Sequence, residues 1–198
     1  MKINRNLAIL FFTMAVVMLG FGIIIPILPF YAENLGANGT ALGVLMAIFS
    51  VMQFIFSPIW GGLSDRIGRK PVILIGVLGN ALAQLFFGLS TSLWMLIAAR
   101  ALSGILSSAT LPTTMAYISD STSDKNRGGG MGVIGAAMGV GMILGPGIGG
   151  WAGSYSLSMP FFVAAALSTA ALVLVWWVLP ESLPAEKRSA KTAYAGPQ

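Results

Sequence analysis

The sequence predicts an all-α integral membrane protein, and both its composition and its long apolar stretches support that prediction. Of the 198 residues, 56% are hydrophobic and only 9% are charged, whereas roughly 25% are charged in a typical soluble domain. Because so few charges cannot cover a water-facing surface, a soluble globular protein is excluded. Six stretches each have the roughly 20 apolar residues that a helix needs to cross a hydrocarbon core of about 30 Å. We therefore expect six transmembrane helices in a lipid bilayer.

The expected spans define one transmembrane domain, residues 1–184, followed by a polar cytoplasmic tail at residues 185–198. In chain order the spans are 7–31, 42–60, 71–89, 93–117, 131–151 and 158–179. The first is longer than the apolar core of a signal peptide, so we expect it to stay as a permanent helix. A short turn at Ser90–Leu93 separates the first three spans from the last three. Because each unit has an odd number of spans, the two units have opposite orientations, which predicts a 3+3 inverted repeat.

Lysine and arginine are distributed asymmetrically among the connections between spans. Ten of the eleven basic residues fall in segments that would lie on one side: Lys2, Arg5, Arg66, Arg69, Lys70, Lys125, Arg127, Lys187, Arg188 and Lys191. Cytoplasmic loops carry such an excess, so both termini are expected in the cytoplasm (N-in/C-in) of the cell membrane. The net charge of +5 is then a topology signal, and no nucleic-acid partner is expected.

Cysteine and histidine are both absent from the chain. Their absence excludes disulfides, Cys/His metal sites and imidazole proton shuttles. A nucleotide-binding loop of the Gly-x-x-x-x-Gly-Lys-Ser/Thr type is also missing. We therefore expect neither an enzyme nor a metal or organic cofactor.

The connection between the second and third spans combines small residues with charges. Its pattern is Gly-x-x-x-Asp-Arg-x-Gly-Arg-Lys, formed by Gly61, Asp65, Arg66, Gly68, Arg69 and Lys70. Glycine permits a tight turn with positive φ, and Asp65 can neutralise a neighbouring arginine or accept hydrogen bonds from helix-end amides. By its residues alone, the loop could equally be a solvated turn that carries topology charges.

Two further motifs lie within the spans. The fourth span contains Arg100-Ala-Leu-Ser-Gly104, and the first contains Leu19-Gly-Phe-Gly-Ile-Ile-Ile-Pro-Ile-Leu-Pro29. The fifth span carries a spaced series of small residues, Gly132, Gly141, Gly145, Pro146, Gly149 and Gly150. In lipid, glycines four residues apart form a smooth stripe that permits close contact between helices.

Together and in this order, these motifs resemble those of the major facilitator superfamily. Over residues 7–184 the chain is similar to the N-terminal six-helix half of bacterial twelve-helix multidrug:proton antiporters. One residue departs from the pattern, because Ser103 stands where the family usually has glutamine. The resemblance implies proton-coupled efflux of small amphipathic compounds, cations among them, by alternating access. The proton would be the coupling ion, and no cofactor is implied.

The resemblance also assigns roles to individual residues. Arg100 would couple transport to protons, and Asp120 would form a charge relay with Arg66 and Arg69 at the cytoplasmic loop. The substrate cavity is expected to be lined by Met18, Phe49, Gln53 and Leu111. An arginine within a span costs at least about 2.5–3.5 kcal/mol by insertion scales, so Arg100 either snorkels to the outer interface or faces a central cavity. Within the spans no acid is available to pair with it.

Members of this family have two six-helix halves, whereas six spans are found here. We therefore expect a second six-helix half, either another copy or a separate chain. The stripe of Gly141, Gly145 and Gly149 is expected to meet that half, although packing within one half is the alternative. The motifs are equally compatible with a non-transporting module that regulates a full transporter, or with a truncated pump. They leave the substrate and the partner open.

Overall fold

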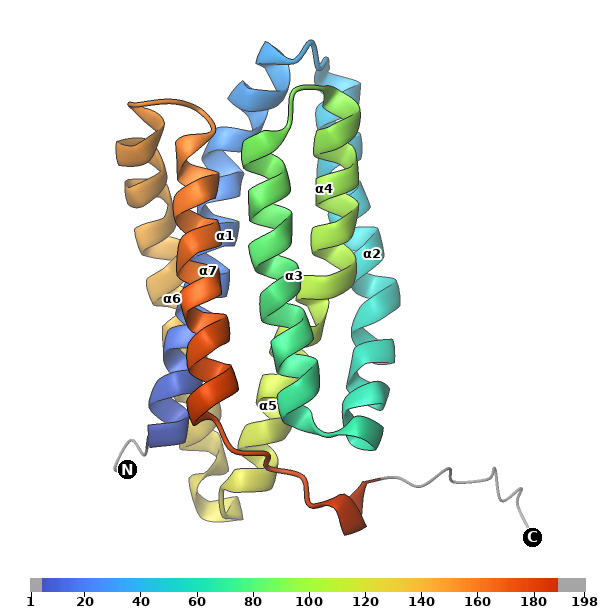
Figure 1. Cartoon of the computed structure of the whole chain (residues 1–198), viewed down its shortest axis with the longest axis vertical. Helices are drawn as coiled ribbons and strands as arrows, with labels where there is room; N and C mark the ends of the chain where they lie inside the picture. Colours follow the sequence, from blue (N-terminus) through green and yellow to red (C-terminus); the bar gives the residue numbers. More distant parts are fainter. Residues whose placement is uncertain (1–4, 189–198) are drawn as a thin grey trace, which may run out of the picture.

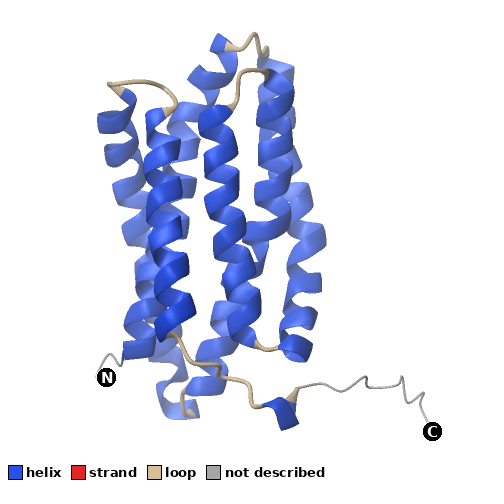
Figure 2. Ribbon diagram, in the orientation of Figure 1, coloured by secondary structure: helices blue, strands red, loops and turns tan. Residues whose placement is uncertain are grey.

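The computed structural model describes residues 5–188, which form a bundle of six long apolar spans (Figure 1). The helices are α1 (Arg5–Asn34), α2 (Gly39–Ile67), α3 (Arg69–Leu89), α4 (Leu93–Leu106), η1 (Ser107–Ala109), α5 (Thr110–Ser121), α6 (Asp124–Gly153), α7 (Met159–Val178) and η2 (Ala185–Lys187). Over this described part of the chain every regular element is helical (Figure 2). Lys2, Lys191 and residues 189–198 of the expected tail lie outside it.

Two of the spans extend well beyond the apolar stretches that predict them. α2 continues to Ile67 and α6 begins at Asp124, so polar and glycine-rich segments that carry no apolar signal are nevertheless helical. At the opposite end, Asn38 Oδ1 accepts a hydrogen bond from Ala41 N (2.9 Å) and caps the first turn of α2. Such a cap satisfies one of the amides that a helix N-terminus leaves unpaired.

The helix pairings follow the expected inverted repeat. The first unit is α1, α2 and α3; the second is the fourth span (α4, η1 and α5), α6 and α7. The principal contacts pair α1 with α6 and with α7, and pair the fourth span with α2 and with α3. The two units correspond when α1 is exchanged with the fourth span, α2 with α6, and α3 with α7. Under this exchange the α1–α6 pairing becomes that of the fourth span with α2, and the α1–α7 pairing becomes that of the fourth span with α3. The contact between α3 and α7 is unchanged. The six spans therefore form a 3+3 inverted repeat.

The fourth span is interrupted, which the apolar pattern did not predict. α4 ends at Leu106, three residues form the 3₁₀ turn η1, and α5 begins at Thr110. Pro112 has no backbone N–H, so the carbonyl of Ser108 lacks its usual α-helical donor, which favours the tighter turn just before it. A short 3₁₀ stretch within a helix often marks a hinge.

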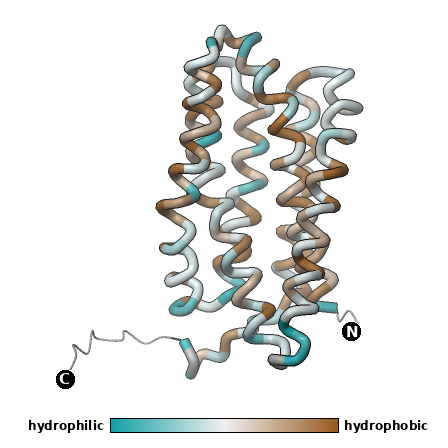
Figure 3. Tube along the Cα trace, turned by 180° about the vertical axis from the view of Figure 1, so that it is seen from behind, coloured by the Kyte–Doolittle hydropathy of each residue, from teal (hydrophilic) through white to brown (hydrophobic). Residues whose placement is uncertain are grey.

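The described chain begins and ends at one end of the bundle, which also holds the α2–α3 and α5–α6 connections (Figure 1). We call this the basic end, because these connections carry lysines and arginines. Pale and brown residues predominate along the helices, whereas the connections at this end are hydrophilic (Figure 3). That the basic end faces the cytoplasm remains a prediction.

Candidate functional site

The α2–α3 connection is a single-residue turn at Gly68. This residue has φ +109° and ψ 161°, a conformation that residues with a Cβ rarely adopt. Its amide donates to Ser64 O (3.1 Å), which closes the last turn of α2. A Cβ at this position would also collide with the carboxylate of Glu181. Glycine is therefore required here both for its backbone conformation and for space.

Arg69, directly after this turn, joins three helices at the basic end. Its Nη1 atom lies 2.7 Å from Asp65 Oδ1 and donates to Ser64 Oγ (2.6 Å), both on α2. Its Nε donates to Asp120 Oδ2 on α5 (2.9 Å). The Arg69 side chain is 10% exposed, against 26% for Asp120 and 54% for Asp65. These four residues, Ser64, Asp65, Arg69 and Asp120, are called the Arg69 cluster below.

The remaining loop residues lie around this cluster without joining it. Arg66 is exposed, and the ion pairs found among residues 5–188 do not include it. Of the two arginines expected in the charge relay with Asp120, Arg69 is therefore the one that pairs with it in this structure, and the part of Arg66 stays a prediction. Lys70 Nζ instead donates to the carbonyl of Trp176 on α7 (2.7 Å), and Gly61 O accepts from Ser64 Oγ (2.7 Å).

Glu181 is a residue of this site that the sequence did not single out. Its carboxylate accepts hydrogen bonds from the amides of Arg69 (2.9 Å) and Lys70 (3.2 Å), the first residues of α3. It also accepts from the amides of Ser182 and Leu183 (2.9 and 3.0 Å). A carboxylate is favourable at a helix N-terminus, so the segment after α7 is fastened to the start of α3. Because 112 residues separate Glu181 from Arg69, nothing local in the sequence indicates the contact.

Arg100 is buried within the bundle, with 2% of its surface exposed. Nε donates to Leu45 O on α2 (3.2 Å), and Cζ lies 4.5 Å from the ring centre of Phe49 and 5.8 Å from that of Phe21. Its Nη1 has no hydrogen-bond partner among the described residues. This burial contradicts the alternative that Arg100 snorkels to the outer interface.

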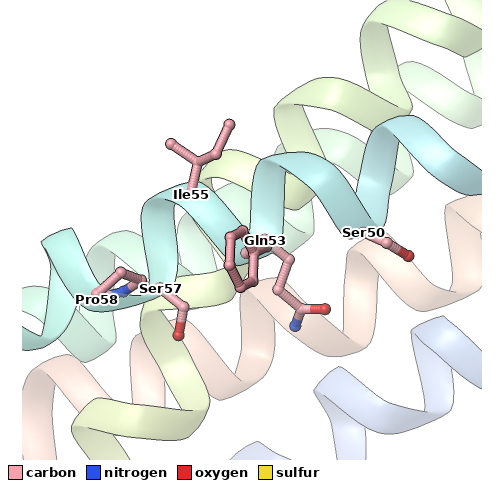
Figure 4. A pocket seen from close by; sticks show the side chains of 6 residues that line it. Ser50, Gln53, Ile55, Ser57 and Pro58 are labelled. Carbon is pink, nitrogen blue, oxygen red and sulfur yellow. The ribbon is translucent and has the colours of Figure 1, made fainter.

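Three of the four expected cavity residues lie together beside Arg100. Met18 and Phe49 line a partly open cavity of about 40 Å³ between α1, α2, α3 and the fourth span. Gln53 lines this cavity too, and it also lines an open groove of about 680 Å³ along α2. Figure 4 shows Gln53 and Ser57 pointing to one side of α2, away from Ile55. Leu111 does not line either space, because it packs with the apolar core nearer the basic end.

The glycine series of α6 divides between two faces. A Cβ on Gly141 would lie 2.7 Å from Leu19 N, and one on Gly145 would lie 2.7 Å from Gly22 Cα. Together with Gly149, which faces Ile27, these glycines pack against α1. The expectation that this stripe meets a second half is therefore wrong, since α1 of the same chain covers it. The other motif members are exposed: Gly132, Pro146 and Gly150.

Comparison with known proteins identifies the family. A model of the Major Facilitator Superfamily matches residues 10–196. The chain belongs to the major facilitator superfamily. It is therefore a multi-pass protein of the cell membrane from a family of transporters, not of enzymes.

Several members of this superfamily are similar to the chain over most of its length. Multidrug resistance protein 2 of Bacillus subtilis is 39% identical over 173 residues, which are 87% of this chain and 43% of that protein. The class B tetracycline resistance protein of Escherichia coli is 42% identical over 163 residues, 80% of this chain and 40% of that protein. The chain thus spans about half the length of the curated relatives it matches.

A solved structure shares the fold. The crystal structure of a human organic anion transporter superimposes with a TM-score of 0.82 and 29% sequence identity. The match covers 96% of this chain and 50% of that one. The six-helix unit therefore corresponds to half of a larger transporter fold.

Proposed function

We propose that this chain forms the N-terminal half of a proton-coupled exporter of small amphipathic compounds, cations among them, that works by alternating access. The observation that carries the proposal is the burial of Arg100 beside the cavity of Met18, Phe49 and Gln53, with one N–H group unpartnered. Relatives named for multidrug and tetracycline resistance support the same activity.

Arg100 would couple transport to protons through a carboxylate of the second half. Its planar guanidinium can bind a carboxylate through two parallel hydrogen bonds. The nearby positive charge favours the ionised acid, so protonation would release the pair. The proton is then the coupling ion, and neither a metal nor an organic cofactor is required.

The Arg69 cluster would act as the gate at the basic end, which we place in the cytoplasm. It links α2, α3 and α5, and Glu181 adds the segment after α7. Ion pairs that are partly exposed can be broken at modest cost, about 0–1 kcal/mol for exposed ones. They are suited to a contact that forms in one orientation of the rocking halves and opens in the other.

A second six-helix half would cover α2 and α6. In the most apolar 18-residue segment of each helix, only 11% of the residues of α2 and 22% of those of α6 are buried, against 61% for α1. Gln53 is exposed near the middle of α2, and polar side chains within a membrane usually face protein or a water-filled cavity. These two poorly buried surfaces are therefore suited to a partner.

Transport should be tested in inverted membrane vesicles from a host that lacks its own drug pumps. The chain would be expressed alone and with the C-terminal half of the Bacillus subtilis relative, and uptake of ethidium followed after a pH gradient is imposed. We expect proton-driven uptake that Arg100→Lys reduces and Arg100→Ala reduces further, with a displaced pH optimum, because the positive charge that favours the ionised acid is repositioned or removed. Superimposable pH profiles for the three proteins would refute a coupling role.

The partner surface can be tested separately, because the chain has no cysteine. Ile143 on α6 and Trp177 on α7 are equally exposed, at 77% and 78%. A single cysteine at Ile143 should crosslink to a second half in membranes, and one at Trp177 should not. Equal crosslinking at the two positions would exclude α6 as the specific contact.

A further inference from the structure

Polar residues recur along one face of the fourth span. They are Arg100, Ser103, Ser107, Thr110, Thr114 and Tyr117, called the polar stripe below. Steps of three and four residues place side chains on one face of an α-helix. The 3₁₀ turn η1 preserves the alignment, because residues i and i+3, here Ser107 and Thr110, eclipse in that geometry. At 1.5 Å per residue the stripe is about 25 Å long, which is most of the thickness of a hydrocarbon core.

The stripe lies inside the six-helix unit, and three of its hydroxyls have no partner within the described part of the protein. Thr110, Thr114 and Tyr117 are at most 1% exposed. The hydroxyls of Ser107, Thr110 and Thr114 have no hydrogen-bond partner among the described residues. Serine and threonine within a helix usually bond to the carbonyl four residues earlier.

Threonines in other spans do make this bond. Thr13 donates to Ile9 O (2.8 Å) and Thr169 donates to Ala165 O (2.9 Å). The hydroxyls of Ser107, Thr110 and Thr114 are thus left available for partners that are not protein groups. Buried polar groups are rarely left unpaired, so these partners are expected to be small molecules that fit between the helices.

A small cavity, lined mainly by apolar surface with a few polar side chains, adjoins each end of the stripe. The one beside Arg100, about 40 Å³, is lined by Ser103 and Ser107 together with Gln53 and Asn80. The one at the basic end, about 30 Å³, is lined by Tyr117 and Ser121. Both exceed the roughly 10–15 Å³ that a cavity needs in order to hold one water molecule.

The middle of the stripe runs against the backbone of α3. A Cβ on Gly76 would collide with Thr110 Oγ1, so a glycine provides the space beside the hydroxyl. At the basic end, Tyr117 donates a hydrogen bond to Pro180 O (2.9 Å). The stripe therefore joins the surroundings of Arg100 to the segment that bears Glu181.

We propose that the polar stripe binds a file of water molecules that connects the cavity beside Arg100 with the cavity at the basic end. Each hydroxyl can donate one hydrogen bond and accept up to two, so successive waters are held in an unbroken chain. This path runs within one half, and it starts from a cavity whose lining residue Gln53 also lines the open groove along α2. Its use by protons rests on the proton-coupled efflux proposed above, whereas its hydration does not.

Single cysteines can test the path, because the chain contains none of its own. Thr110→Cys and Thr114→Cys place thiols on the stripe. Ala109→Cys is the matched control, because Ala109 is 0% exposed, lies next to Thr110 and is off the stripe. Silver ion, which moves through water-filled paths, would be added to the full chain in proteoliposomes, and free thiols counted by maleimide labelling after denaturation. We expect both stripe thiols to react at least tenfold faster than the control.

A stripe thiol that reacts no faster than Ala109→Cys would overturn the proposal. For any variant that loses native elution from a sizing column, radiolytic hydroxyl-radical labelling of the unmodified chain decides instead. Tyr117 should then be labelled faster than Phe161, which is equally buried but lines neither small cavity, and equal labelling would overturn the proposal. Both measurements report hydration and not transport, so a dry stripe would leave the proposed efflux standing, and absent efflux would leave the water path standing.

Discussion

Replacing Gly145 by alanine should separate α1 from α6 and destabilise the bundle. The added Cβ would lie 2.7 Å from Gly22 Cα and 2.9 Å from Leu19 O, and both of these are backbone atoms that cannot rotate away. Carbon atoms in optimal contact are about 3.5–4.0 Å apart, so the helices must move by several tenths of an ångström to an ångström. Overpacking of this kind typically costs about 1–3 kcal/mol.

The cost of an alanine substitution should depend on how closely each glycine packs against the other helix. A Cβ on Gly22 would lie 3.2 Å from Gly145 Cα, so Gly22→Ala should cost less than Gly145→Ala. A Cβ on Gly147 would meet nothing within 4 Å, and alanine favours a helix over glycine by up to about 1 kcal/mol in water. Gly147→Ala should therefore be neutral or slightly stabilising.

The measurement is equilibrium unfolding of the full chain in mixed dodecylmaltoside and SDS micelles, followed by circular dichroism. Gly145→Ala and Gly147→Ala should differ by at least about 1 kcal/mol in the free energy of unfolding. If the two variants are indistinguishable, or if Gly147→Ala is the less stable, the assignment of the glycine stripe to α1 is refuted.

The same unfolding assay tests the contacts at the basic end. Asp120→Asn should cost more than Asp65→Asn, because its pair with Arg69 is less exposed and therefore less screened. The double variant should lose about 0.5–3 kcal/mol more unfolding free energy than the sum of the two single losses, because Arg69 then keeps no carboxylate partner. Losses that simply add would contradict a shared cluster. Glu181→Gln should cost up to about 2 kcal/mol by removing the charge at the N-terminus of α3, whereas Glu186→Gln, at an exposed position, should cost nothing measurable. Equal effects of the two glutamate variants would argue against the cap.

The sequence could predict features that depend on the total hydrophobicity of a segment or on a few residues adjacent in the chain. Each span is predicted by a run of about 20 apolar residues. The transfer of such a run into lipid is favourable regardless of which other helices it contacts. The positive φ of Gly68 follows from a short turn between two long helices. The break in the fourth span also has a local cause, Pro112. The hydrophobicity of a segment, however, does not depend on whether one of its residues lacks a backbone N–H group.

Contacts between distant residues were decided by the tertiary structure. The spacing of Gly141, Gly145 and Gly149 predicted a smooth helix face, but not that α1 would cover it. Arg66 and Arg69 are both positively charged and lie close together in the sequence. The positions of their side chains in the folded protein decide that Arg69 pairs with Asp120. Glu181 reaches the start of α3 across 112 residues of sequence.

The sequence by itself therefore determined the membrane location, the six spans and the family motifs of this protein. The tertiary structure decided which partners those motifs have. The physical reason is that hydrophobic transfer acts on each segment independently, whereas hydrogen bonds, ion pairs and close packing depend on atoms within a few ångströms that the fold alone brings together.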